Sequence, residues 1–178
     1  MKKIIVTVAI ALSAFSVNAQ KFMTRSGKVT FFSATPIENI EAFNNEAAAA
    51  VNSATGDIVF QVPIKSFKFE QQLMQEHFNE SYMESDKFPK AEFKGKMNAV
   101  DISKDGTYKT TVSGKMTIHG VTKDVQIPGT LTVKGGELTL NSKFMVATAD
   151  YKINIPSLAA GKVAKQIEVT VNTILKKA

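Results

Sequence analysis

The stretch YKTTVSGKMTI, from Tyr108 to Ile118, alternates between two kinds of side chain along its whole length. Every second position, beginning at its tyrosine, is apolar or small, and the positions between carry lysine, serine or threonine. A period of two puts one face of an extended chain on a core and the other in water, so this stretch predicts a half-buried β-strand. The Asp105-Gly106 step before it is a hairpin turn signal. We therefore expect an antiparallel pair with the similarly alternating run from Ala91 to Met97.

The same period of two recurs along most of the chain, with turn signals and prolines between the runs. Gly135-Gly136 predicts a further hairpin turn. Pro63 cannot donate a ladder hydrogen bond and predicts an edge or a bulge. Pro128-Gly129 predicts a kink or bulge where its strand curls. The predicted strands are Phe22 to Phe32, Ile58 to Ile64, Ala91 to Met97, Tyr108 to Ile118, Val125 to Val133, Leu138 to Val146, Tyr151 to Ile155 and Gln166 to Leu175.

Two segments carry helical signals. From Gln71 to Met83 the apolar residues recur at helical spacing, which predicts a short amphipathic helix between strands. Ile37 to Val51 contains four consecutive alanines and is a second helical candidate by propensity. In the alternative interpretation, Ser53 to Gly56 is a turn and Glu46 to Val51 is the strand that pairs with Ile58 to Ile64.

A strand count near eight predicts an all-β protein with a short helix. An open antiparallel sheet of this size exposes two long edges that invite aggregation, and closure into a barrel removes them. An eight-stranded barrel encloses an interior that side chains fill or that holds one small ligand. We therefore predict an eight-stranded antiparallel β-barrel, and the strand pattern leaves open whether its interior is filled or hollow.

The first residues predict export. Lys2 and Lys3 precede an apolar run from Ile4 to Val17, and Val17-Asn18-Ala19 has the small-residue pattern that signal peptidase cleaves. The alternative is a membrane anchor, but the run is shorter than the roughly 20 apolar residues that span a bilayer. We expect residues 1–19 to be a cleaved signal peptide and residues 20–178 to form a single domain, periplasmic or secreted.

Composition narrows the chemistry. The chain has no cysteine, which excludes a lipid-modified cysteine at the cleavage site, a disulfide framework and a thiolate metal site. The formal charge of +6 becomes +4 when the two signal-peptide lysines are removed. Arg25 is the only arginine, so the basic residues predict a solvated surface and no nucleic-acid partner. A charge of this size allows transient contact with an anionic membrane surface.

The sequence offers little catalytic machinery. Its two histidines, His77 and His119, have no carboxylate at ligand spacing, and the pattern favours structural hydrogen-bonding roles for both. Neither a glycine-rich phosphate loop nor a Gly-x-Ser-x-Gly elbow is present. We therefore predict no catalytic residue, no metal and no cofactor. The alternative is an enzyme that acts on a sequestered lipid with His77 or His119 as the base.

Three ordered blocks carry a family resemblance. The first runs from Glu76-His77-Phe78 to KFPKAEF (Lys87 to Phe93), the second is VSGKMTIHGVTK (Val112 to Lys123), and the third is DYKI (Asp150 to Ile153). In these blocks the chain resembles the YceI-like proteins. The resemblance implies an extended lipocalin-like barrel with an internal apolar cavity, a helix near one mouth, and an isoprenoid-like lipid in the lumen. It does not imply catalysis.

Apolar residues are concentrated between Phe60 and Phe93, where they form either an ordinary core or the wall of a binding cavity. With the resemblance, we predict a cavity for a polyisoprenoid, an isoprenoid quinone or a fatty amide. The alternative is a structural or stress-response interaction protein with a filled barrel. The oligomeric state stays open, a dimer included. The candidate ligand-binding residues are Phe60, Val62, Phe67, Phe69, Leu73, Met74, Phe78, Met83, Phe88, Phe93, Met97, Met116, Ile118, Phe144, Val146, Tyr151 and Ile153.

Overall fold

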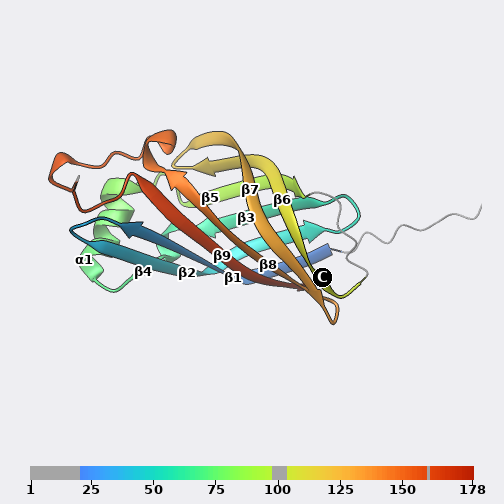
Figure 1. Ribbon diagram of the computed structural model, residues 1–178. Helices are drawn as coiled ribbons and strands as arrows, with labels where there is room; N and C mark the ends of the chain where they lie inside the picture. Colours follow the sequence, from blue (N-terminus) through green and yellow to red (C-terminus); the bar gives the residue numbers. More distant parts are fainter. Residues whose placement is uncertain (1–20, 98–103, 160) are drawn as a thin grey trace, which may run out of the picture.

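Eight antiparallel strands close into a barrel (Figure 1). The computed structural model describes residues 21–97, 104–159 and 161–178, so the predicted signal peptide lies outside the described part. The strands follow the order β1-β9-β8-β7-β6-β5-β3-β2 around the wall, and pairing of β1 with β2 completes the ring. The predicted all-β, eight-stranded antiparallel barrel is confirmed.

The strands are long and most connect in sequence order. The two-residue β4 (Lys68–Phe69) pairs only with β2 and adds a short flap beside the ring. The strands of the ring are β1 (Lys21–Ala34), β2 (Asn39–Asn52), β3 (Asp57–Pro63), β5 (Lys90–Met97), β6 (Gly106–Ile118), β7 (Val121–Lys134), β8 (Glu137–Ala147) and β9 (Gln166–Lys177).

The helical prediction for Ile37 to Val51 is wrong, and its strand alternative is confirmed. The segment forms β2, which pairs with β1 along its length and with β3 from Ala48 to Val51. The buried inward positions include Ala42, Ala47 and Ala49. Alanine has good helix propensity, but two flanking strands satisfy the backbone hydrogen bonds of β2, and this tertiary pairing overrides a weak local preference.

The predicted strand from Tyr151 to Ile155 is also wrong. Thr148–Tyr151 forms the 3₁₀ helix η3, and Lys152 follows it in the left-handed region with φ 54°. A left-handed residue cannot continue an extended strand, so the short apolar run leaves the sheet there. A second 3₁₀ helix, η4 (Ser157–Ala159), lies in the connection from η3 to β9.

The two proline signals have different outcomes. Pro63 is the last residue of β3 and lies beyond the pairing with β2, which stops at Gln61, so β3 has the predicted free edge there and the 3₁₀ helix η1 (Ile64–Ser66) follows. No bulge lies at Pro128 in the pairing of β7 with β6, whose register is continuous. The pairing of β7 with β8, however, stops at Gly129 and Ser142, next to this proline.

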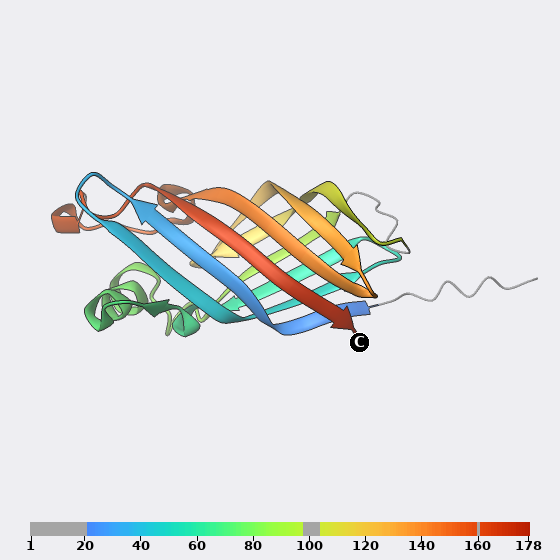
Figure 2. The ribbon, with the colours of Figure 1, turned by 60° about the horizontal axis from the view of Figure 1, so that its bottom comes forward.

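A short helical segment covers one end of the barrel. The predicted helix between Gln71 and Met83 is present as α1 (Gln72–His77), which continues into the π-helical turn η2 (Phe78–Tyr82). Figures 1 and 2 show this segment at the same end as the β1–β2 turn and the connection before β9, opposite the C-terminus. Among the described residues, no helix is long and apolar enough to cross a membrane.

Apolar side chains fill the other end of the barrel. Strand ends that gather near the C-terminus contribute Leu131, Leu138 and Leu175, all with no exposed surface, together with Phe22 and Val51. A smaller cluster around Ile64, Phe67 and Met83 lies under the helical segment. The barrel is therefore packed at one end, and the space left in its interior lies toward the helical end.

Candidate functional site

The interior of the barrel contains a cavity of about 710 Å³. Its volume lies within the roughly 300–1,000 Å³ that is usual for small-molecule sites. The lining is mostly apolar, and inward positions of the strands and residues of the helical segment both contribute to it. Among the described lining residues, the charged ones are Glu38, Glu92 and Lys162. The predicted internal apolar cavity is confirmed.

Four phenylalanines form one wall of this cavity. The ring centroid of Phe31, on β1, lies 5.4 Å from those of Phe67 and Phe78 and 5.6 Å from that of Phe69. Phe69 and Phe78 are 5.0 Å apart. These separations fall within the range of favourable aromatic pairs. The cluster thus attaches the η2 turn to the barrel and presents an apolar surface to the lumen.

Fourteen of the 17 predicted binding residues line the cavity. Of the other three, Met97 and Tyr151 belong to the packed core, and the Phe88 ring lies 4.6 Å from that of His119. The contact of the fourteen with a ligand stays a prediction. These fourteen are Phe60, Val62, Phe67, Phe69, Leu73, Met74, Phe78, Met83, Phe93, Met116, Ile118, Phe144, Val146 and Ile153.

The sequence-based selection missed the walls contributed by the first and last strands. Val29 and Phe31 on β1 and Val169 and Val171 on β9 all line the cavity. Their signal was present, because both pairs lie on the apolar face of an alternating run. The alternation shows which residues point inward. It does not show where along the barrel axis the packed core ends and the cavity begins.

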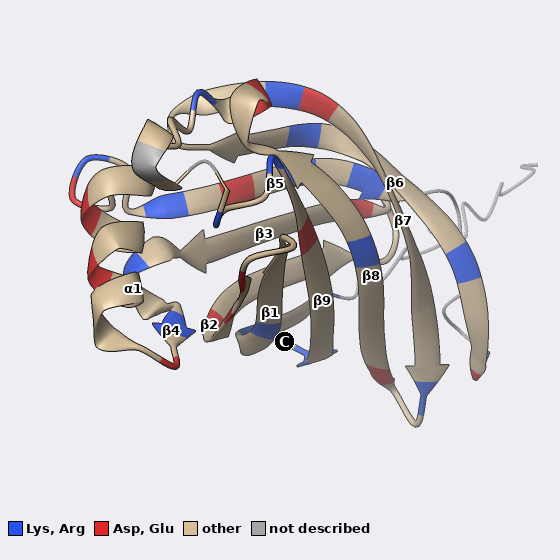
Figure 3. Cartoon of the chain, turned by 60° about the vertical axis from the view of Figure 1, so that its left-hand side comes forward, with Lys and Arg blue, Asp and Glu red and all other residues tan. Residues whose placement is uncertain are grey.

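Basic and acidic residues are interspersed along the strands of the barrel (Figure 3). Cross-strand ion pairs join Lys115 to Asp124 at 2.9 Å and Lys143 to Glu168 at 2.8 Å. Exposed pairs of this kind contribute little stability. The interspersed signs give this surface no broad field of one charge. Among the described residues, no group of three or more His, Cys, Asp or Glu side chains is placed to hold a metal ion.

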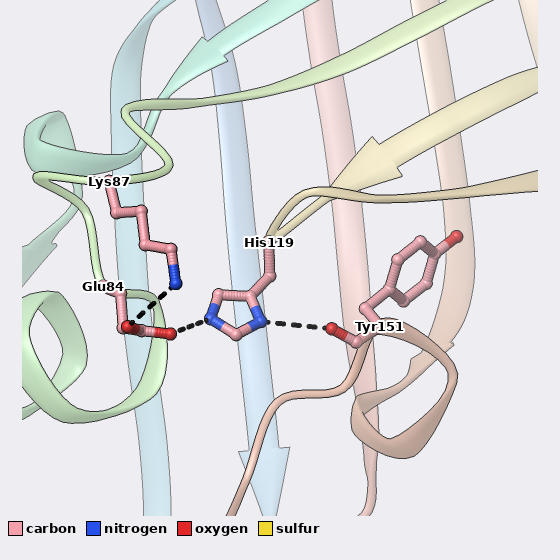
Figure 4. Close-up of polar contacts among 4 residues, drawn as sticks. All are labelled: Glu84, Lys87, His119 and Tyr151. Carbon is pink, nitrogen blue, oxygen red and sulfur yellow. Dashed lines mark hydrogen bonds and ion pairs between the residues drawn. The ribbon is translucent and has the colours of Figure 1, made fainter.

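His119 joins three segments at the edge of the barrel (Figure 4). Its Nε2 lies 2.9 Å from Oε2 of Glu84, which follows η2, and its Nδ1 lies 3.2 Å from the carbonyl oxygen of Tyr151 in η3. The imidazole side chain is only 10% exposed. Lys87 adds a longer contact of 3.8 Å to the same carboxylate.

This arrangement gives His119 a structural role, as the sequence predicted. Both ring nitrogens are already in contact with oxygen atoms of the protein, so neither is left to act as a base on a ligand. His119 is also not among the described residues that line the cavity, whereas His77 is. The His119 contacts hold η3 and the segment after η2 in place against the β6–β7 turn.

Tyr151 should make the barrel sensitive to alkaline pH. Burial raises the pKa of its phenol, and the neighbouring Asp150 carboxylate raises this pKa further. Because the pKa is raised in the folded state, folding favours the neutral phenol. This contribution to the free energy of unfolding is complete below the ordinary tyrosine pKa of about 10 and is lost as the pH rises through the folded-state pKa. We expect Tyr151→Phe to flatten the alkaline decline in unfolding midpoint, measured by urea titrations from about pH 8 to 11. An unchanged decline in this variant would contradict the assignment.

The fold and the cavity together define a class of protein, the closed antiparallel β-barrels that are packed at one end and hollow at the other. Within this class, a family model for the YceI-like domain matches residues 6–175. The chain therefore belongs to the YceI-like family. A comparison with curated proteins gives no match.

Solved structures share the fold at low sequence identity. A polyisoprenoid binding domain from Saccharophagus degradans has a TM-score of 0.76 and 11% identity, over 90% of this chain and 99% of that one. BcnA from Burkholderia cenocepacia has a TM-score of 0.71 and 16% identity, over 84% and 95%. The YCEI protein of Campylobacter jejuni has a TM-score of 0.59 and 16% identity, over 77% and 84%.

Proposed function

We propose that this protein is an exported carrier that sequesters one long-chain amphiphile, such as a polyisoprenoid, an isoprenoid quinone or a fatty amide, without transforming it. The observation that carries the proposal is the apolar cavity of about 710 Å³ inside a barrel whose other end is solid. The structural neighbour from Saccharophagus degradans, described as a polyisoprenoid binding domain, supports the choice of ligand class. The apolar run after Lys2 and Lys3 supports export.

We expect a long ligand, because the described residues that line the cavity are mostly apolar. At about 0.8 kcal/mol per buried methylene, ten carbons contribute roughly 8 kcal/mol, comparable with the 4 to 15 kcal/mol lost on association. A tail of 20 carbons contributes roughly 16 kcal/mol on the same scale. Affinity should therefore depend mainly on tail length, and short chains should bind weakly.

The test is to recover what the protein holds in its own cell. The native protein, purified without detergent from its exporting host, is extracted with organic solvent and the extract is analysed by mass spectrometry. We expect one amphiphile per protein chain, with a hydrocarbon tail of about 20 carbons or more. An empty extract from a protein that also fails to take up geranylgeraniol in vitro would overturn the proposal.

A further inference from the structure

The barrel wall opens between β7 and β8. These strands pair only from Gly129 to Lys134 and from Glu137 to Ser142. Beyond this ladder β7 continues back to Val121 and pairs with β6, whereas β8 continues to Ala147 and pairs with β9. Pro128 stands where the ladder stops and has no N–H to donate. We call this opening the β7–β8 seam.

The cavity reaches the outer surface at the seam. The residues that line both the cavity and a groove on the outside of the barrel include Thr110, Gly129 and Ser142. Their backbone positions form a row, since Thr110 pairs with Gly129 and Gly129 pairs with Ser142. No side chain fits at the centre of this row, because a Cβ on Gly129 would lie 2.7 Å from the backbone oxygen of Asn141. The lining residues shared by the cavity and the groove, at the point where the ladder stops, indicate a side opening in the barrel wall.

A polar group is missing a partner at this point. Thr110 is 9% exposed, and among the described residues its Oγ1 has no hydrogen-bond partner. Ser142 Oγ donates to the carbonyl oxygen of Pro128 at 2.6 Å and keeps its lone pairs free to accept. The next paired residues toward the packed end, Leu131 and Leu140, are buried and apolar. The polar atoms thus lie at the floor of a mostly apolar cavity.

The outside of the seam is basic. Lys109 and Lys143 line the outer groove, and no Asp or Glu is among its described lining residues. Lys143 also contacts Glu168 on β9 at 2.8 Å, so part of its charge is balanced from outside the groove. The Thr110 hydroxyl, as a free donor beside lysine ammonium groups, suits an anionic oxygen, because charge-assisted hydrogen bonds are the stronger kind.

We propose that the β7–β8 seam holds the polar end of the ligand, a phosphate-bearing head group, while the tail extends from the floor toward the phenylalanine cluster under η2. The proposal rests on the carrier function and adds the orientation and head-group class of the ligand. Thr110 Oγ1 hydrogen-bonds a head-group oxygen, and Lys109 and Lys143 neutralise its charge from outside.

The experiment compares geranylgeranyl phosphate with geranylgeraniol, which have the same 20-carbon tail, by titration calorimetry on the full mature chain. Thr110→Val keeps the shape of the side chain and removes only the hydroxyl, so we expect both affinities to fall about tenfold. The double variant Lys109→Gln and Lys143→Gln should weaken the phosphate about tenfold and leave the alcohol unchanged. Lys115→Gln is the matched control and should change neither affinity, because Lys115 is an exposed, ion-paired lysine on the strand of Lys109 and is not among the described residues that line the cavity or the groove. Lys162→Gln tests the lysine that lines the cavity outside the seam.

Three results would overturn the inference. A loss of phosphate affinity in Lys162→Gln, with the seam variants unchanged, would place the head group away from the seam and leave the carrier function intact. Inorganic phosphate that binds as tightly as the lipid phosphate, with the same dependence on Lys109 and Lys143, would assign the seam to a free anion. Equal affinities of the seam variants and the original protein for both probes would exclude a head-group contact there. If neither probe binds the original protein, the carrier proposal itself fails.

Discussion

Replacing Ala91 by phenylalanine is expected to weaken geranylgeraniol binding about a thousandfold while the barrel stays folded. Ala91 lies on β5, lines the cavity and is paired with Val62. The new ring occupies space that the ligand tail otherwise fills. Six displaced carbons at about 0.8 kcal/mol each correspond to roughly 5 kcal/mol, or more than three powers of ten in affinity. Calorimetric or fluorescence titration measures the loss directly.

A control variant separates occupancy of the cavity from damage to the strand. Lys94 is on the same strand, and its exposed side chain points to solvent. Lys94→Phe adds a ring of the same kind outside the barrel and should bind geranylgeraniol as the original protein does. If Ala91→Phe binds with unchanged affinity and melts at an unchanged temperature, the ligand does not occupy this part of the lumen.

Much of the barrel could be predicted because one simple pattern determines it. Every second residue of a strand such as Tyr108 to Ile118 faces the same side of the sheet. Neighbouring strands pair with this strand on both sides, so closure of the barrel follows from the same pattern. The predicted turn at Gly135-Gly136 joins β7 to β8 and is confirmed. Short turns have specific residue requirements, so this turn could also be predicted from a local pattern. Strands and turns of this kind could be predicted because a few neighbouring residues determine their geometry.

The errors occurred where distant segments decide the geometry. Four alanines from Ala47 to Ala50 have helical propensity, yet the neighbouring strands β1 and β3 hold them extended. Tyr151 to Ile155 alternates like a strand, but the His119 contact to the Tyr151 carbonyl and the turn at Lys152 fix another path. The β1 partners of the alanines and the His119 partner of Tyr151 lie far along the chain, so no window of a few residues contains these contacts.

The sequence predicted the kind of residue that lines the cavity better than it predicted where in the barrel the cavity lies. Apolar residues from Phe60 to Phe93 indicated where a wall should form, and most of them line the cavity. Phe31 was missed although it is central to the phenylalanine cluster, because its partners come from segments more than 30 residues away. The only sequence signal for the β7–β8 seam was Pro128-Gly129. The pairing of β7 with β8 stops at this step, whereas the pairing of β7 with β6 continues through it.

The pair of glycines that join β5 and β6 should be the least tolerant point of the barrel. Gly95 and Gly114 face each other across the two strands. A Cβ on Gly114 would lie 2.5 Å from the Cα of Gly95 and closer still to the carbonyl oxygen of Lys94. The obstruction is backbone, which cannot rotate away as a side chain can. We expect Gly114→Ala to lower the free energy of unfolding by about 3 kcal/mol or more.

The reason for this close approach is visible on the inner face. A Cβ on Gly95 would lie 2.6 Å from Cζ of Phe93, so this ring folds over the glycine and covers its backbone. The bare backbone lets β5 and β6 approach closely beside the cavity wall that Phe93 forms. Urea denaturation of Gly114→Ala measures the cost, with Gly106→Ala as the matched control. At Gly106 the nearest obstruction to a Cβ is the side chain of Tyr108 at 3.2 Å, which can move, so we expect a change below about 1 kcal/mol. Equal stability losses in the two variants would show that the strands are not held together by the glycine pair.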